Sequence, residues 1–200
     1  MAKTNKNAPK TNRKTKKVET PITIKNYQKL AMRTCLPACE CWAYAFPALM
    51  SEMCEFFAKH YGQYAKSVRG DFDDDLDCGF ENYSKIRKEI KKELGDIAWS
   101  LALICKVGGY KFCKELELAK KKGELHLVKM FLEDNIHDTV NAITFGEEEK
   151  KRRTMEFCFH IFASYCHYYR FKVSDVLRDN IRKLASRQKR GVIMGNGDNR

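Results

Sequence analysis

The sequence predicts an all-α fold, and three observations support this prediction. Only 4 prolines and 11 glycines occur in 200 residues, so residues that break helices are scarce. Apolar residues recur at steps of three and four along several segments, as one face of a helix requires. Hydrophobic residues make up 44% of the chain and charged residues 32%, a balance typical of a globular domain.

The first two helical segments differ in character. A short amphipathic helix is expected over 24–33, and Pro37 interrupts it. A strongly apolar stretch follows over about 39–66, in which Pro47 marks either a kink or a helix start. The acidic, glycine-containing segment 69–79 is then expected to form a loop.

The clearest periodicity lies over about 83–107. Gly108 and Gly109 are expected to end this helix, because glycine adopts the left-handed backbone common at helix C-termini. The predicted core face of this helix consists of Ile86, Ile90, Leu94, Ile97, Leu101 and Ile104.

The second half of the chain is also predicted to be helical. Residues 110–146 are more polar, with a break expected at 120–124. An aromatic-rich helix is expected over about 148–169. Ser174 is a favourable N-cap for a last helix over 175–188.

Positive charge is concentrated at the amino terminus. The net charge is +12, and half of it lies in residues 1–20, where seven basic residues accompany one acidic residue. This tail is expected to be disordered, serving as a solubilising extension or as a contact for nucleic acid. No secretory signal and no run of about 18 apolar residues is present, so a cytoplasmic protein without membrane contact is expected.

The chain contains nine cysteines, most of them within apolar helical stretches. The odd number and these surroundings favour reduced thiols over disulfides. Cys35, Cys39 and Cys41 form C-x3-C-x-C, which is not a usual zinc spacing, so buried structural thiols are expected there.

Two pairs of acidic residues are candidates for chemistry. Glu52 and Glu55 lie three residues apart in FPALMSEMCEFF, and Glu93 and Asp96 have the same spacing in KKELGDIAWSLALI. This spacing places both carboxylates of a pair on one helix face. Apolar residues surround these pairs, and acidic side chains are seldom buried unless a cation accompanies them.

A divalent cation would reconcile four carboxylates on two packed helices, because their charges otherwise repel one another. Oxygen ligands favour Mg²⁺, with Mn²⁺ as a substitute, over zinc or copper. The alternative is a pair of ordinary helix faces whose acids form salt bridges with Lys59, Lys91 and Lys92. The residues by themselves leave both interpretations open.

Several segments resemble the MazG-like group of all-α nucleoside triphosphate pyrophosphohydrolases. An ExxE pair followed by an ExxD pair on a later helix is the signature of this superfamily. YQKLAMRT at 27–34 is similar to the group's opening helix, and KKELGDIAWSLALI at 91–104 is similar to its ELGDxLWxLA segment. KVSDVLRDNIRKLASRQKRGVIMGNGDNR at 172–200 is similar to the C-terminal helix and its RGVI-x-G-x-GDNR ending.

The resemblance covers three stretches, 22–66, 83–106 and 158–200. It departs from the group's pattern in two places: 37 residues separate Glu55 from Glu93, and about 50 residues at 107–157 are inserted. The resemblance implies one MazG-like helical bundle over 21–200, assembled as a homodimer or homotetramer. The inserted helical segment would alter assembly or close over the substrate.

The resemblance also implies a reaction. Members of this group hydrolyse nucleoside triphosphates to the monophosphate and pyrophosphate, which controls nucleotide pools. By their place in the motifs, Glu52, Glu55, Glu93 and Asp96 correspond to the Mg²⁺ ligands. Either Glu52 or Glu55 would also polarise the attacking water.

The residues expected to bind substrate are Lys59, Trp99, Asn180, Lys183, Arg187 and Arg200. For Lys183 and Arg187 an ordinary solvated helix face is an equal alternative. Trp99 either stacks on a base or packs in the core, and core packing is expected for His160 and His167.

Three other functions are alternatives to this one. A di-iron bundle requires Glu-x-x-His motifs, which are missing near either acidic pair. A nucleic-acid-binding helical protein would use the basic tail. A non-catalytic relative is disfavoured because all four acidic positions are filled. The base and the sugar of the substrate are not indicated by any of these residues.

Overall fold

The computed structural model describes residues 21–69, 78–122 and 148–191, and within these ranges all the regular structure is helical. The predicted all-α fold is therefore confirmed. Four sequence predictions fall outside the described residues: the basic tail, most of the acidic loop, most of the 110–146 segment and Arg200.

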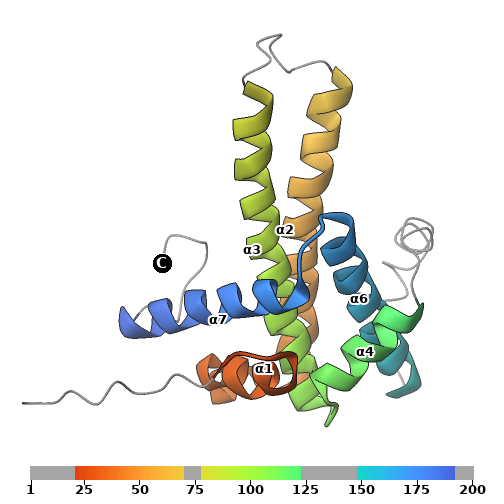
Figure 1. Cartoon of the computed structure of the whole chain (residues 1–200). Helices are drawn as coiled ribbons and strands as arrows, with labels where there is room; N and C mark the ends of the chain where they lie inside the picture. Colours follow the sequence, from red (N-terminus) through yellow and green to blue (C-terminus); the bar gives the residue numbers. More distant parts are fainter. Residues whose placement is uncertain (1–20, 70–77, 123–147, 192–200) are drawn as a thin grey trace, which may run out of the picture.

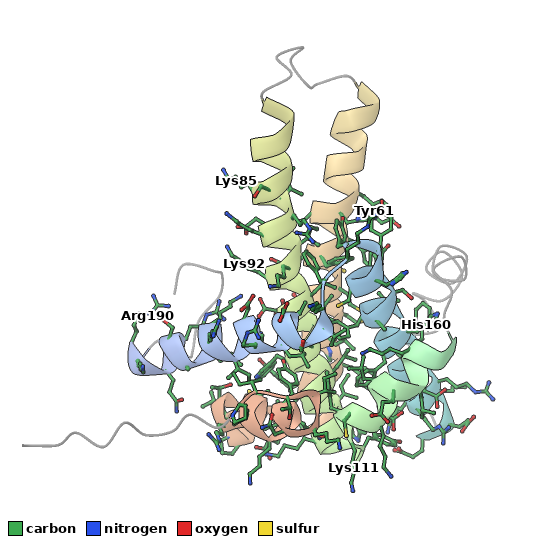
Figure 2. The ribbon with its side chains drawn as sticks, in the orientation of Figure 1. Tyr61, Lys85, Lys92, Lys111, His160 and Arg190 are labelled. Carbon is green, nitrogen blue, oxygen red and sulfur yellow. The ribbon has the colours of Figure 1, made fainter. Side chains whose placement is uncertain are left out.

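The helices form two groups (Figure 1). The long helices α2 and α3 run antiparallel, and α7 crosses α3 with α1 beside it at the base. Helices α1, α2, α3 and α7 form the first group, and α4 and α6 pack together as the second. Side chains fill the space where α4 and α6 meet α3 (Figure 2). Their bounds are α1 Ile24–Ala31, α2 Trp42–Arg69, α3 Cys78–Val107, α4 Phe112–Lys122, α6 Glu148–Tyr168 and α7 Val173–Lys189.

The first helix is short but well capped. The Thr23 side chain accepts a hydrogen bond from the Asn26 amide, and the Asn26 side chain accepts one from the Thr23 amide. This reciprocal capping box satisfies two amides at the helix start. Tyr27 and Ala31 are fully buried, so the predicted amphipathic face is the face that packs.

The second helix begins before Pro47, so the interpretation of this proline as a helix start is wrong. The Cys41 carbonyl already accepts hydrogen bonds from the Tyr44 and Ala45 amides. Pro47 lies inside α2 at an exposed position. Its missing N–H therefore costs one helical hydrogen bond on the solvent side rather than in the core.

The predicted face of α3 is confirmed. Five of its six apolar residues are fully buried, and Ile86 packs against the same core. From Leu101 to Cys105 every residue is buried, because α1, α2, α4 and α6 enclose this end of the helix. The helix ends as predicted: Gly109 has φ +73°, and the Tyr110 amide donates to the Cys105 carbonyl at 2.7 Å.

Aromatic side chains of α6, and of the residue that follows it, pack against aromatic side chains of α2. The rings of Phe56 and Tyr165 meet edge to face with centroids 4.7 Å apart, and His60 Nδ1 lies 2.5 Å from the Tyr169 hydroxyl. Burial lowers the pKa of His60, which favours the neutral ring in this contact.

The α6 helix ends in the same geometry as α3, but with arginine in place of glycine. Arg170 has φ +53°, and the Phe171 amide donates to the Cys166 carbonyl at 2.8 Å. A left-handed backbone disfavours residues that carry a Cβ. Arg170→Gly is therefore expected to stabilise the fold by about 0.5–1 kcal/mol, after the greater chain entropy of unfolded glycine is allowed for. Denaturant unfolding should show a higher midpoint at an unchanged slope, and Arg170→Ala should show no such gain.

The predicted N-cap of the last helix is wrong by two residues. α7 begins at Val173 with Lys172 at the N-cap position, so Ser174 lies within the first turn. The α6 end places Phe171 and Val173 against the core, and the Asp175 and Val176 amides then bond to the Lys172 carbonyl. Packing of these apolar residues outweighs the modest preference of serine for a cap.

The described parts of the insertion belong to the core. Phe112, Leu116 and Ala119 of α4 are buried, and the rings of Phe112 and Phe159 pack 5.2 Å apart. Phe112 also contacts the Tyr27 ring, at 5.0 Å. Helix α4 therefore supports α1 directly.

The cysteine predictions are confirmed only in part. All eight cysteines whose side chains are described are free thiols, and Cys105, Cys158 and Cys166 are buried. Cys35 and Cys39 are only half-buried and Cys41 is exposed, so the expected buried cluster is wrong. The 3₁₀ turns at 32–34 and 37–39 carry this segment over the surface. In the part of the chain that the structure describes, the helices are too short or too polar to cross a membrane.

Candidate metal centre

Three of the four predicted acids come together where α2 and α3 pack. Carboxylate oxygens of Glu52, Glu93 and Asp96 all lie within 4.8 Å of one another. Glu93 is only 2% exposed, and the other two are half-buried. The ExxD spacing presents Glu93 and Asp96 on one side of α3, and the antiparallel packing brings Glu52 of α2 to that side.

The fourth acid lies at the edge of this group. Glu55 is exposed and is not among the three clustered carboxylates. Its charge nevertheless acts on the cluster, because it is one cause of the raised pKa of Glu52. In this structure Glu55 lies close enough to influence the site electrostatically without joining the cluster.

Two lysines form ion pairs with acids of the cluster. Lys59 of α2 donates to Glu93, and Lys183 of α7 donates to Asp96 Oδ2 at 2.5 Å. The salt-bridge interpretation of the acidic pairs is thus correct for Lys59. The other two lysines pair elsewhere: Lys91 with Asp179 and Lys92 with Glu89.

A buried hydrogen-bond chain fixes the orientation of Asp96. Asn180 donates from Nδ2 to Asp96 Oδ1 at 3.3 Å, and the Tyr27 hydroxyl donates to Asn180 Oδ1 at 2.8 Å. Asn180 is 3% exposed. Burial, followed by the charge of Asp96, raises the pKa of Tyr27, so the hydroxyl keeps its proton for this bond. Sequence reasoning selected Asn180 and Lys183 but missed Tyr27, although Tyr27 is the first residue of the YQKLAMRT segment at 27–34.

Gly95 allows α7 to approach α3 at this point. A Cβ added at Gly95 would lie 3.1 Å from the Asn180 Cβ and 3.3 Å from its Nδ2. Sequence reasoning missed this role too. The sequence does contain a signal for this role: Gly95 lies in mid-helix between two acids. Glycine at such a position costs about 1 kcal/mol of helix stability relative to alanine, which favours a specific reason for its presence.

Tyr27→Phe tests the hydrogen-bond chain. Removing the hydroxyl leaves a buried amide oxygen of Asn180 without its donor, which is expected to destabilise the fold by about 1–2 kcal/mol. Because Asp96 then loses its fixed orientation, we also expect Mg²⁺ to bind about tenfold more weakly. Calorimetry measures the affinity, and Tyr168→Phe is the control because Tyr168 is exposed. An unchanged Mg²⁺ affinity would assign Tyr27 a structural role alone.

The carboxyl group of Glu52 is strongly perturbed. Its pKa is raised to about 7, chiefly by burial, then by the charges of Asp96, Glu55 and Glu93, while Lys183 lowers it. Among the residues that the structure describes, the three clustered acids carry one more charge than Lys59 and Lys183, and Glu55 adds a second negative charge. A divalent cation matches both this charge and the oxygen-only ligands.

The remaining predicted residues lie as follows. Trp99 packs beside α1, where its indole N–H donates to the Ala31 carbonyl and the Thr34 hydroxyl, both at 3.3 Å. Arg187 is half-buried, one turn beyond Lys183. His160 of α6 faces the Ala119 carbonyl of α4 at 3.3 Å.

The expectation of core packing for His167 is wrong. His167 is exposed in the last turn of α6. His167 lies one residue before the end of α6, and Tyr168 beside it is exposed as well, so these two residues of the last turn face solvent rather than the core.

Comparisons with protein-family models, with curated proteins and with solved structures found no match to this chain.

Proposed function

We propose that the protein is a Mg²⁺-dependent nucleoside triphosphate pyrophosphohydrolase of the MazG-like type. The observation that carries this proposal is the meeting of Glu52, Glu93 and Asp96 at the packing of α2 and α3. The acids come from the ExxE and ExxD pairs. Gly95, which lies between Glu93 and Asp96, allows a third helix, α7, to approach the same place.

In this proposal Glu93 and Asp96 are the central ligands, with Glu52 and Glu55 completing the set. Bound Mg²⁺ would neutralise the triphosphate and make water a better nucleophile. Of Glu52 and Glu55, Glu52 is the better candidate for the base that activates the attacking water. Glu93 and Asp96 are each held by a lysine, whereas no ion pair with Glu52 is present among the described residues. Its carboxylate is thus able to accept the proton of the attacking water.

The two lysines are suited to contact phosphate oxygens. Lys59 has 37% of its side chain exposed, so it is able to leave Glu93 and reach a phosphate when the metal takes its place. Lys183 is anchored on α7 beside Asn180 and extends into the cluster. Both would then compensate charge as the α–β bond breaks, the main demand of phosphoryl chemistry. Arg187, Arg200 and base stacking by Trp99 stay predictions, as does assembly into a homodimer or homotetramer.

The test is a panel of nucleoside and deoxynucleoside triphosphates with Mg²⁺ or Mn²⁺. Release of monophosphate and pyrophosphate, abolished by chelator and restored by added Mg²⁺, is the expected result. Release of diphosphate and orthophosphate would mean cleavage at another bond and would exclude the proposal. Inactivity on the whole panel, together with Mg²⁺ binding unaffected by Glu93→Gln, would show that the cluster is not a catalytic centre.

A further inference from the structure

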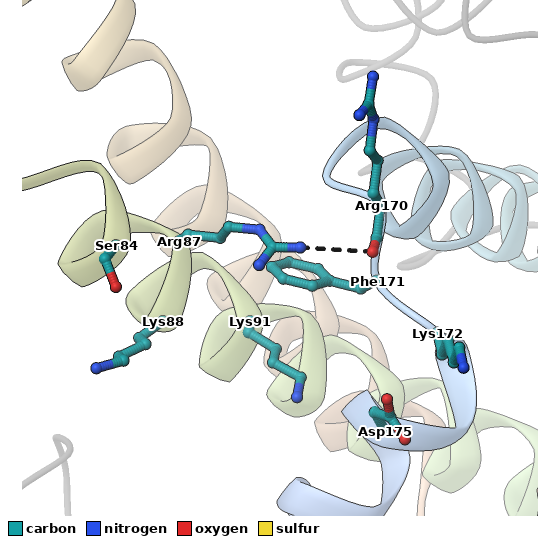
Figure 3. A pocket seen from close by; sticks show the side chains of 8 residues that line it. All are labelled: Ser84, Arg87, Lys88, Lys91, Arg170, Phe171, Lys172 and Asp175. Atoms are coloured by element: carbon teal, nitrogen blue, oxygen red, sulfur yellow. Dashed lines mark hydrogen bonds between the residues drawn. The ribbon is translucent and has the colours of Figure 1, made fainter. Parts of the chain in front are cut away.

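A second charged site lies on α3, away from the carboxylates. A pocket of about 490 Å³ opens between α3 and the connection from α6 to α7 (Figure 3). Its lining holds five basic residues and one acid. The charged residues are Arg87, Lys88, Lys91, Arg170, Lys172 and Asp175.

Helix geometry separates this pocket from the candidate metal centre. Each residue turns an α-helix by about 100°, so Lys91 points roughly 160° away from Glu93 and roughly 140° away from Asp96. The pocket shares no lining residue with the carboxylate cluster. A ligand in the pocket would therefore not be the ligand of the proposed metal.

Arg87 and Phe171 of the lining hold each other in place. The Arg87 guanidinium stacks on the Phe171 ring, 4.6 Å from its centroid, and donates to the carbonyls of Tyr169 at 3.0 Å and Arg170 at 3.4 Å. Figure 3 shows this stack, with the Arg170 guanidinium directed away from the other labelled side chains. The strained φ of Arg170 thus belongs to a turn that shapes the pocket wall.

The positive charge of the pocket is only partly compensated. Asp175 pairs with Arg178 at 2.6 Å, and Lys91 pairs with Asp179 outside the lining. Lys88 and Lys172 are exposed, and within the described part of the chain neither forms an ion pair. Helix α7 also begins here without a side-chain cap. Its Asp175 and Val176 amides bond to the Lys172 carbonyl, so it is the amides before them that add positive partial charge.

We propose that this pocket binds a small ligand that carries two or more phosphate groups. Because the Arg170 guanidinium is directed away, only the other four basic residues of the lining are counted, and they exceed Asp175 by three charges. A single phosphate group has a charge of about −1.5 to −2, which is less than this excess. A pocket of about 490 Å³ has the volume of a small-molecule site, whereas nucleic acid requires an extended basic surface. The ligand would be held by Lys88, Lys91 and Lys172 and by the first turn of α7.

The experiment uses the full chain in chelator at low salt, so that metal-held phosphate does not contribute. Inorganic pyrophosphate and a nucleoside triphosphate are titrated by calorimetry, with the uncharged nucleoside as a third arm. The pocket variant is Lys88→Gln with Lys172→Gln. Its matched control is Lys85→Gln with Lys189→Gln, which removes the same charge from exposed positions of the same two helices. Figure 2 shows Lys85 projecting from α3.

We expect the pocket variant to bind pyrophosphate at least about tenfold more weakly and the control variant to bind it normally. Asp96→Asn should also bind it normally, which separates this site from the metal centre.

A better affinity for the triphosphate would indicate a nucleotide as the natural source of the phosphates. Equal weakening in both double variants, or binding of the uncharged nucleoside alone, would overturn the proposal. Tighter binding of a single-stranded oligonucleotide, weakened by the same two substitutions, would instead assign the surface to nucleic acid.

Discussion

Glu93→Gln is expected to reduce Mg²⁺-dependent turnover by at least about 100-fold while leaving the fold intact. Glutamine has the same shape but lacks the charge that a buried ligand must supply. Lys59, the partner that loses its salt bridge, is partly exposed and reaches water, so no buried charge is left unpaired. Initial rates give kcat/KM, and circular dichroism with thermal unfolding reports the fold.

Glu89→Gln is the matched control for this variant. Glu89 lies on the same helix one turn earlier and pairs with Lys92 near the surface, so its loss is expected to change neither turnover nor Mg²⁺ affinity. Mg²⁺ should raise the melting temperature of this control as it does that of the unmodified protein, and it should not stabilise Glu93→Gln. A misfolded Glu93→Gln protein would instead indicate that Glu93 is needed for the fold.

Glu52→Gln is expected to stabilise the metal-free protein at high pH. The pKa of Glu52 is raised from 4.5 to about 7 on folding, so ionised Glu52 is less favourable in the folded state than in the unfolded state. The contribution of Glu52 to the stability of the unmodified protein is thus fully present below about pH 4.5 and is lost as the pH rises through about 7. Because Glu52 is partly exposed, we expect the variant to gain about 1–2 kcal/mol near pH 8 and little near pH 5.

Denaturant unfolding in chelator at these two pH values measures the gain. Glu89→Gln should show no comparable pH dependence. With Mg²⁺ present the order should reverse, because the metal stabilises the unmodified protein at a site that the variant lacks. A gain that is equal at both pH values would mean that the crowded charge of Glu52 is not its cause. A variant that is more stable but inactive is expected where the function of a site requires carboxylates that repel one another in the metal-free protein.

The local elements were predictable because their signals are local. The face of α3 and its ending at Gly109 depend on residues within a few turns of one another, and the structure confirms both. The errors lie at boundaries where packing competes with local preference. Pro47 lies within α2, and α7 begins before Ser174, because contacts from other helices outweigh a cap or a missing hydrogen bond.

The sequence by itself determined that the chain is helical, where most of its core faces lie, and which acids share a face on each of two helices. The tertiary structure decided which side chains meet. The contacts from Lys59 to Glu93, Lys183 to Asp96 and Tyr27 to Asn180 join residues 34, 87 and 153 positions apart. Helical periodicity fixes only the direction of a side chain around its own axis. The packing of α2 and α7 on α3 fixes which of those directions converge, and that depends on the whole core.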